Sequence, residues 1–338
     1  METLNNDDNP SVILDGSYRR NFANLNRVSI ATSPAIARHL PPLIARCAQC
    51  AGRTAQEVPL PSGLRLHIAA APIFGPEGDV FGVGLRAGPP SGHNLTPPTI
   101  GAAQWNNKTG SATVSPALRS LLGLSGNKSY CYTTPSTLFS RFDHWEDRPG
   151  FLSLFDATAP TDRWFGTATV RSRTGPRRYL YIAAKASATD HTVRALVCDI
   201  SETDSPPPAD YASAALRRLR PQFGHAVGIV DLKSRIIHEW IAAENSTLAQ
   251  WGHHLPWVHV DDASIISEAV TRLLQGTYTA TTLFRITIDD TNWITVKARW
   301  TLISGGDRPQ ALIEATPVSG VTDIVAFTNE HPRTQFDS

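Results

Sequence analysis

No long apolar run is present in the 338-residue sequence. Its apolar stretches stay well short of the ~18 consecutive residues that a membrane-spanning helix needs. The first ten residues are polar and acidic, so the usual apolar core of a secretory signal is also missing there. We therefore expect a cytoplasmic protein with no membrane partner.

An excess of charge of either sign is missing too. The 31 basic residues nearly balance the 30 acidic ones, and the formal net charge of +1 gives no field that would attract nucleic acid. One short basic segment, Leu216–Arg220, has no interleaved aromatic residues and is too small for a nucleic-acid site. We expect it to belong to a linker helix that packs on the module after it.

Residue sets for catalysis or metal binding are few. Cys47 and Cys50 form a C-x-x-C pair in a helix-like stretch, and no second ligand pair lies at the spacing of a zinc site. Two small buried helix residues are the simpler interpretation. Neither a G-x-x-x-x-G-K phosphate loop nor a G-x-S-x-G nucleophile turn occurs. We expect no enzymatic activity, no cofactor and no tightly held metal ion.

Two histidine groups leave alternatives open. His144 and Asp147 suit acid–base chemistry, but they equally suit the start of a helix that Asp143 caps. Four further histidines suggest a metal site by their closeness in sequence: His238, His253, His254 and His259. Without cysteines or well-spaced carboxylates beside them, neutral loop histidines fit better.

An internal repeat is the most informative feature that is present. Three strand-like segments align around Ile68, Ile182 and Val296, which are separated by 114 residues in each step. The segments 144–147 and 259–262 lie 115 residues apart and share a His-x-x-Asp or His-x-Asp-Asp pattern. Several matches at nearly one offset indicate three related modules.

Alternation assigns faces to the last strands of each module, which form an antiparallel hairpin or meander. On the middle strand, Leu180 and Ile182 match Ile294 and Val296, so this face is expected to point into the core. The opposite face carries three aromatic residues, which are expected to point outward: Tyr179, Tyr181 and, in the third module, Trp293.

The front half of the later modules completes the pattern. Strand-like segments at 100–105 and 226–231 are followed by short helical patterns such as 116–123. Two strands, small helices, one longer helix and three strands make a module of ~110 residues, large enough for its own core. The expected fold class is α+β, with three tandem modules, each an antiparallel sheet with helices on one face.

The second module resembles a PAS domain. Gln104–Gly110 resembles the first PAS hairpin, and Ser115–Leu124 resembles the helix that follows it. His144–Arg148 resembles the start of the long PAS helix, with Trp145 in place of the usual proline, and Asp199–Ser201 resembles the close of the last strand.

The order of parts resembles a family of uncharacterised actinobacterial proteins, through the opening Val12–Gly16 and the turn 72–78. The resemblance implies a GAF/PAS-like domain over 1–92, a PAS domain over 99–204, a PAS-like domain over 209–318 and a flexible tail over 319–338. The resemblance concerns the architecture; from the modules themselves we expect a non-enzymatic sensory or regulatory protein that binds a small ligand and signals through protein contacts. The alternative is a ligand-free interaction scaffold or a homodimerising adaptor.

The second module is expected to hold the ligand pocket. Four residues are expected to line it from the sheet: Trp164, Phe165, Leu180 and Ile182. The outward aromatic residues Tyr179, Tyr181 and Trp293 are expected to contact a partner protein or a second copy. Alternatively, the linker helix over 210–220 covers them within the same chain.

Overall fold

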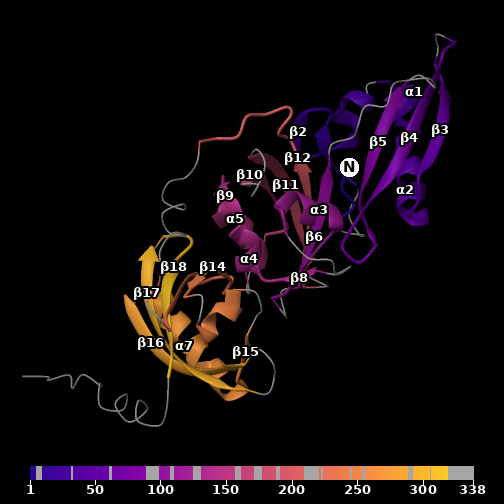
Figure 1. Ribbon diagram of the computed structural model, residues 1–338. Helices are drawn as coiled ribbons and strands as arrows, with labels where there is room; N and C mark the ends of the chain where they lie inside the picture. The colour runs from indigo at the N-terminus through magenta and orange to yellow at the C-terminus, as the bar shows by residue number, and fades with distance from the viewer. Residues whose placement is uncertain are drawn as a thin grey trace, which may run out of the picture. The chain divides into compact units, whose positions relative to one another are not determined.

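A computed structural model shows a mixed α+β protein built mostly from antiparallel sheets with few helices (Figure 1). It describes residues 1–4, 10–31, 33–60, 63–88, 99–106, 110–124, 131–156, 161–170, 177–187, 191–208, 221, 224–243, 246–252, 256–287, 292–304 and 306–318. The chain divides into two compact units, Met1–Leu216 and Arg217–Ser338. The linker helix over 210–220, His253, His254 and the tail over 319–338 lie outside the described residues. The division into three domains stays a prediction.

The N-terminal part of the first unit carries a three-stranded antiparallel meander in the order β3-β4-β5 and a separate hairpin, β1-β2. The strands are β1 (Val12–Asp15), β2 (Tyr18–Ala23), β3 (Thr54–Pro59), β4 (Arg65–Phe74) and β5 (Val80–Gly88). The connecting helices are η1 (Leu25–Arg27), η2 (Ser29–Ala31), α1 (Pro34–Ala37) and α2 (Leu40–Cys50). Glu2 forms backbone bridges with both Gly82 in β5 and Ser11 beside β1, and so joins the hairpin to the meander.

Helix α2 covers one face of this meander. Its buried residues follow the spacing of an amphipathic helix: Leu40, Leu43, Ile44 and Cys47. They share a core with Val58, Ile68 and Val83 from the three strands. Cys50 is exposed, so the interpretation of the C-x-x-C pair as two buried helix residues is confirmed for Cys47 and wrong for Cys50.

The rest of the first unit is built on a seven-stranded sheet in the order β8-β7-β6-β12-β11-β10-β9. Its strands are β6 (Ile100–Asn106), β7 (Ala112–Val114), β8 (Cys131–Thr133), β9 (Phe142–Trp145), β10 (Arg163–Val170), β11 (Arg178–Ser187) and β12 (Thr192–Asp199). Its helices are α3 (Pro116–Leu122), α4 (Pro135–Phe139), α5 (Arg148–Leu152) and η3 (Ser153–Phe155). We call this the second sheet.

The second unit repeats the order of two strands, helices and a final meander. Its six-stranded sheet has the order β14-β13-β18-β17-β16-β15. The strands are β13 (Ala226–Asp231), β14 (Ile237–Ala242), β15 (Trp257–Val258), β16 (Thr279–Thr287), β17 (Ile294–Ser304) and β18 (Gln310–Pro317). The helices are η4 (Thr247–Gly252), η5 (Val260–Asp262) and α7 (Ala263–Leu274).

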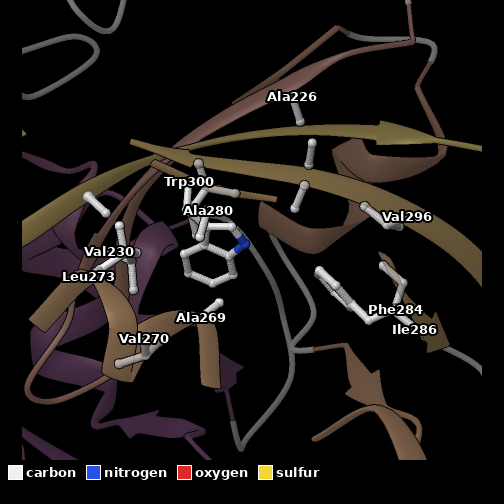
Figure 2. Close-up of a cluster of buried hydrophobic side chains, with 14 of the residues drawn as sticks. Ala226, Val230, Ala269, Val270, Leu273, Ala280, Phe284, Ile286, Val296 and Trp300 are labelled. Atoms are coloured by element: carbon white, nitrogen blue, oxygen red, sulfur yellow. The ribbon is translucent and has the colours of Figure 1, made fainter. Parts of the chain in front are cut away.

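The core of the second unit gathers around Trp300 in β17 (Figure 2). Helix α7 contributes Ala269, Val270 and Leu273 to this core. The indole Nε1 of Trp300 donates a hydrogen bond to Thr282 Oγ1 at 2.8 Å, so the one polar atom of this buried ring is satisfied.

The sequence repeat has a structural counterpart. Ile68, Ile182 and Val296 lie in β4, β11 and β17, the middle strands of the three meanders, and all three side chains are buried. In each sheet of the later modules, the strand that opens the module lies beside the strand that closes it. The alternation rule therefore placed the core-facing residues correctly.

The repeated His-Asp segments are helix starts, but their details differ from the expectation. Asp147, not Asp143, caps α5: its Oδ1 accepts a hydrogen bond from the Gly150 amide at 2.9 Å. Asp143 lies within β9, which pairs with β10, so no helix begins there. The prediction of a longer helix in this module is wrong for the described residues. Helix α5 starts only after β9 and spans Arg148–Leu152.

In the second unit, Asp262 precedes α7 and holds Arg285. Its carboxylate accepts hydrogen bonds from the Arg285 amide and from Nε and Nη2 of the guanidinium at 2.8, 2.8 and 2.9 Å. The Arg285 hydrogen bonds outweigh the opposite effect of burial and lower the pKa of Asp262 to about 2. Both residues of the repeat, Asp147 and Asp262, thus serve structure.

Gly82 lies where β5 comes close to the second sheet. A Cβ atom at this position would lie 2.7 Å from the Met1 carbonyl oxygen and 2.9 Å from Leu196 Cδ1 in β12. At Gly84 in the same strand, the nearest atom would be the Ala71 carbonyl oxygen at 3.8 Å. The close contact, not the strand itself, requires glycine at position 82.

We expect Gly82→Ala to destabilise the first unit by about 1–3 kcal/mol, because backbone and a buried leucine must shift to admit the methyl group. Gly84→Ala is the matched control and should be neutral or slightly stabilising, since alanine restricts the unfolded chain. Urea unfolding of the full chain measures both. Equal stability of the two variants would contradict the close contact.

We expect Asp262→Asn to lower the stability of the second unit at neutral pH. A carboxyl with a depressed pKa stabilises the folded state above its ordinary value of about 3.9 and loses that contribution as the pH falls. The difference in the free energy of unfolding between Asp262→Asn and the parent chain should therefore shrink as the pH falls from 4 to the folded pKa of about 2. Denaturant unfolding across this range tests it, and Asp261→Asn, an exposed neighbour, should show little change.

Candidate functional site

The outer face of the second sheet, opposite its helix-covered side, is covered by the N-terminal part of the same unit. One buried cluster joins Leu4, Ile13, Phe22 and Phe81 to residues of the second sheet that include Tyr179, Tyr181 and Leu196. Tyr179 is 9% exposed and Tyr181 is 1% exposed, so their expected exposure is wrong. They do point away from the face of Leu180 and Ile182, as alternation predicted, but strand periodicity cannot show what covers a face.

Polar contacts hold the N-terminal part in place on the outer face of the second sheet. The Tyr181 hydroxyl donates a hydrogen bond to the Arg20 carbonyl oxygen at 2.8 Å. Burial raises the pKa of Tyr181, which keeps the hydroxyl protonated and a donor. Arg194 Nη1 donates to the Leu4 carbonyl oxygen at 3.1 Å.

A buried ion pair lies in the same contact. Lys185 Nζ in β11 is 3.0 Å from Glu2 Oε1, and both side chains are almost fully buried. Glu2 also accepts hydrogen bonds from the amides of Leu4 and Ser11 at 3.0 and 3.2 Å. The Phe22 ring lies 5.5 Å from Lys185 Nζ, within cation–π range. Each charge is therefore satisfied in a place that water does not reach.

The four expected pocket residues do not line one pocket. Trp164 and Phe165 are neighbours in β10 and so point to opposite faces of the sheet. Phe165 is 40% exposed and its ring centroid lies 6.4 Å from that of Phe22 in the outer contact. Leu180 and Ile182 are buried on the Trp164 side, as expected.

The inner side of the second sheet is filled by aromatic rings. Phe151 of α5 lies at the centre, with ring centroids 4.8–5.9 Å from those of Trp145, Trp164, Trp105, Phe139 and Phe155. Trp164 Nε1 donates to Asp147 Oδ2 at 3.0 Å, which ties β10 to the start of α5. This arrangement is a packed core.

A cavity of about 370 Å³ lies instead in the N-terminal part. Its walls come from the β1–β2 hairpin, the η1–η2 segment and the end of β5. The lining residues are Met1, Val12, Leu14, Asp15, Gly16, Leu25, Val28, Ser29, Ile30, Leu85, Arg86 and Ala87. Most are apolar, and the volume lies within the ~300–1,000 Å³ typical of small-molecule sites.

Asp15 is the buried charge of this cavity. Its carboxylate accepts hydrogen bonds from the Ser29 amide and hydroxyl, and Arg20 Nη2 lies 3.1 Å from Oδ2. Burial alone would raise the pKa of Asp15, but the hydrogen bonds from Ser29 and Arg20 prevail and lower it. Asp15 is thus an ionised group that the protein itself already neutralises.

Only a weak sequence signal pointed to this site. The segment Val12–Gly16 carried part of the family resemblance, and its acidic residue follows three apolar ones. Of the other walls, Leu25–Ile30 follows soon after in the chain, whereas Leu85–Ala87 comes from β5, and no local pattern connects β5 with the hairpin.

Trp293 of the second unit is 45% exposed, as expected for an outward residue. Its ring lies edge-on to His259, with centroids 4.8 Å apart. Trp257 in the edge strand β15 is 63% exposed.

Within the parts of the chain that the structure describes, no group of three or more His, Cys, Asp or Glu side chains is arranged to hold a metal ion. Among the helices of the described residues, none is long and apolar enough to cross a membrane.

The chain is similar in fold to the crystal structure of an uncharacterised protein from Mycobacterium tuberculosis. The two are 18% identical, the match covers 96% of this chain and 97% of the other, and the TM-score is 0.71. No family model matches the sequence, and no curated protein is similar to it by sequence.

Two signalling proteins also align with parts of the chain. A sensory box histidine kinase/response regulator from Burkholderia thailandensis is 18% identical, over 35% of this chain and 86% of the other, with a TM-score of 0.24. An RNA-binding light-oxygen-voltage receptor is 9% identical, over 67% of this chain and 96% of the other, with a TM-score of 0.25. Scores this low do not establish a common fold, so the comparisons show only the fold shared with the mycobacterial protein.

Proposed function

We propose that this chain is a non-enzymatic regulatory protein of tandem PAS-like modules that binds a small ligand in its N-terminal part. The observation that carries the proposal is the cavity of about 370 Å³, because one of its walls, the β1–β2 hairpin, also packs on the second sheet. A ligand there would contact the segment that joins the two parts of the first unit.

The lining favours a compact, neutral ligand that carries both apolar and polar groups. Val12, Leu14, Val28 and Leu85 offer apolar walls. Asp15 needs no charge from a ligand, since Arg20 and Ser29 already satisfy it. Its carboxylate can still accept a hydrogen bond from a hydroxyl or amine at one edge of the ligand.

The PAS-like part of the proposal rests on the order of elements. Both large sheets run from two strands through helices to a three-stranded meander, and the motifs that resemble PAS domains lie in the second sheet and its helices. The aromatic core inside the second sheet favours the scaffold alternative for that module. We therefore assign ligand binding to the N-terminal part and a contact role to the others.

Trp293 is the contact residue that we propose in the second unit. It is a large aromatic side chain and it is half exposed, and the edge strand β15 of the same sheet carries a second exposed tryptophan, Trp257. Aromatic residues of this kind are enriched at the centres of protein interfaces. Tyr179 and Tyr181 are not proposed for this role, since they are buried inside the first unit.

We expect Ala87→Trp to abolish ligand binding, because residue 87 lines the cavity and an indole would occupy it. Binding is measured with N-phenyl-1-naphthylamine, a neutral apolar dye whose fluorescence rises in apolar surroundings. The parent chain should bind one dye saturably, and the variant should lose most of the signal.

Ala55→Trp is the matched control. Residue 55 is exposed in β3 of the same meander and does not line the cavity, so this variant should bind the dye like the parent chain. Lack of saturable binding by the parent chain, or equal binding by both variants, would contradict the proposed site.

We expect Trp293→Ala to weaken self-association while leaving the melting temperature nearly unchanged, because the side chain is largely outside the core. Light scattering after size-exclusion chromatography reports the oligomeric state. Tyr278→Ala, another exposed aromatic position in this unit, is the control. A monomeric parent chain, or a marked loss of stability in the variant, would refute the contact role.

A further inference from the structure

We infer that the β1–β2 hairpin transmits ligand occupancy of the cavity to the second sheet through Arg20 and Tyr181. This inference rests on the proposed function, since it requires that the cavity binds a ligand. It adds where the effect of the ligand goes and which bond carries it.

The hairpin contacts the cavity with some residues and the second sheet with others. Val12, Leu14 and Asp15 line the cavity, and Ile13 and Phe22 belong to the buried cluster on the second sheet, against which Leu14 also packs. A two-stranded ribbon has little stability of its own, so these two sets of contacts determine where the hairpin lies. A ligand that adds contacts at the cavity changes how firmly the hairpin is held on the second sheet.

Arg20 links the two sets of contacts within one residue. Its side chain holds Asp15 at the cavity wall, with 3.1 Å between Nη2 and Oδ2. Its carbonyl oxygen accepts the hydrogen bond from Tyr181 at 2.8 Å. Ser29, Asp15, Arg20 and Tyr181 thus form a continuous polar chain from the cavity to the second sheet.

The backbone beside this link is strained. Phe22 has φ of +50°, in the left-handed region that an aromatic residue rarely adopts. The hairpin also has a shift in register between Val12 and Leu14. Such conformations persist only where the surroundings impose them, and they gather at switching segments. At Phe22, the ring packs edge-on to Phe165 and lies under the Lys185 ammonium.

The direction of the effect follows from reciprocity. A ligand that packs on Val12 and Leu14 stabilises the docked hairpin, so it must also strengthen the hold of the hairpin on the second sheet. Conversely, weakening the Tyr181 contact lowers ligand affinity by the same factor.

Amide hydrogen exchange of the full chain, with and without N-phenyl-1-naphthylamine, tests this. In the parent chain, the dye should slow exchange several-fold both in residues 12–23 and in β11 of the second sheet. In Tyr181→Phe, which keeps the ring and loses the hydroxyl, the dye should still bind with at most a severalfold loss of affinity. It should then slow exchange in the hairpin but no longer in β11.

Tyr278→Phe, the same change at an exposed position of the second unit, should behave like the parent chain. If the dye does not bind the parent chain, the proposed function fails. If the dye binds but does not slow amide exchange in β11, the dye site is correct and the transmission route is wrong. The same conclusion follows if the dye slows exchange in β11 of Tyr181→Phe as much as in the parent chain.

Discussion

The buried contact between Glu2 and Lys185 is the constraint on which the rest of the first unit depends. Two charges removed from water are stable only when their geometry is good and their remaining hydrogen bonds are made. Here the amides of Leu4 and Ser11 complete the shell of Glu2. Because breaking such a pair leaves a buried charge unpaired, the first residues of the chain can lie on the second sheet in only one register.

The position of the cavity follows from that register. Residues 1–4 connect the hairpin to the meander, and the hairpin otherwise forms its own two-stranded sheet. Ile13 and Phe22 are held by the second sheet, whereas Val12 packs in the core that α2 shares with the three-stranded meander. The space that remains is lined from both sides by apolar residues. The cavity is thus lined by residues of the N-terminal part alone, many of them from its own core, while the hairpin that forms one wall also packs on the second sheet.

Local periodicity predicted what lies within a strand, and failed for what lies between distant segments. The repeat and the alternation placed Ile68, Ile182 and Val296 in core-facing positions of the middle strands. The Tyr181 hydroxyl is bound by the carbonyl oxygen of Arg20, which lies 161 residues earlier. The sequence around one of these residues gives no sign of its contact with the other. The pocket assigned to Trp164 and Phe165 ignored the fact that neighbours in a strand point to opposite faces. The cavity itself depends on four separate segments, so only the structure could reveal it.

The two large sheets show how one module can be adapted to two environments. On the outer face of β11 the residues after Tyr179 and Tyr181 are Ala183 and Lys185, all buried. At the matching positions of β17 lie Thr295, Lys297 and Arg299, and both cationic residues are exposed. Long charged side chains keep their charges in water and need no cover, whereas tyrosine and alanine leave an apolar face that must be buried. The difference in these few residues explains why the outer face of the second sheet is covered by the N-terminal part.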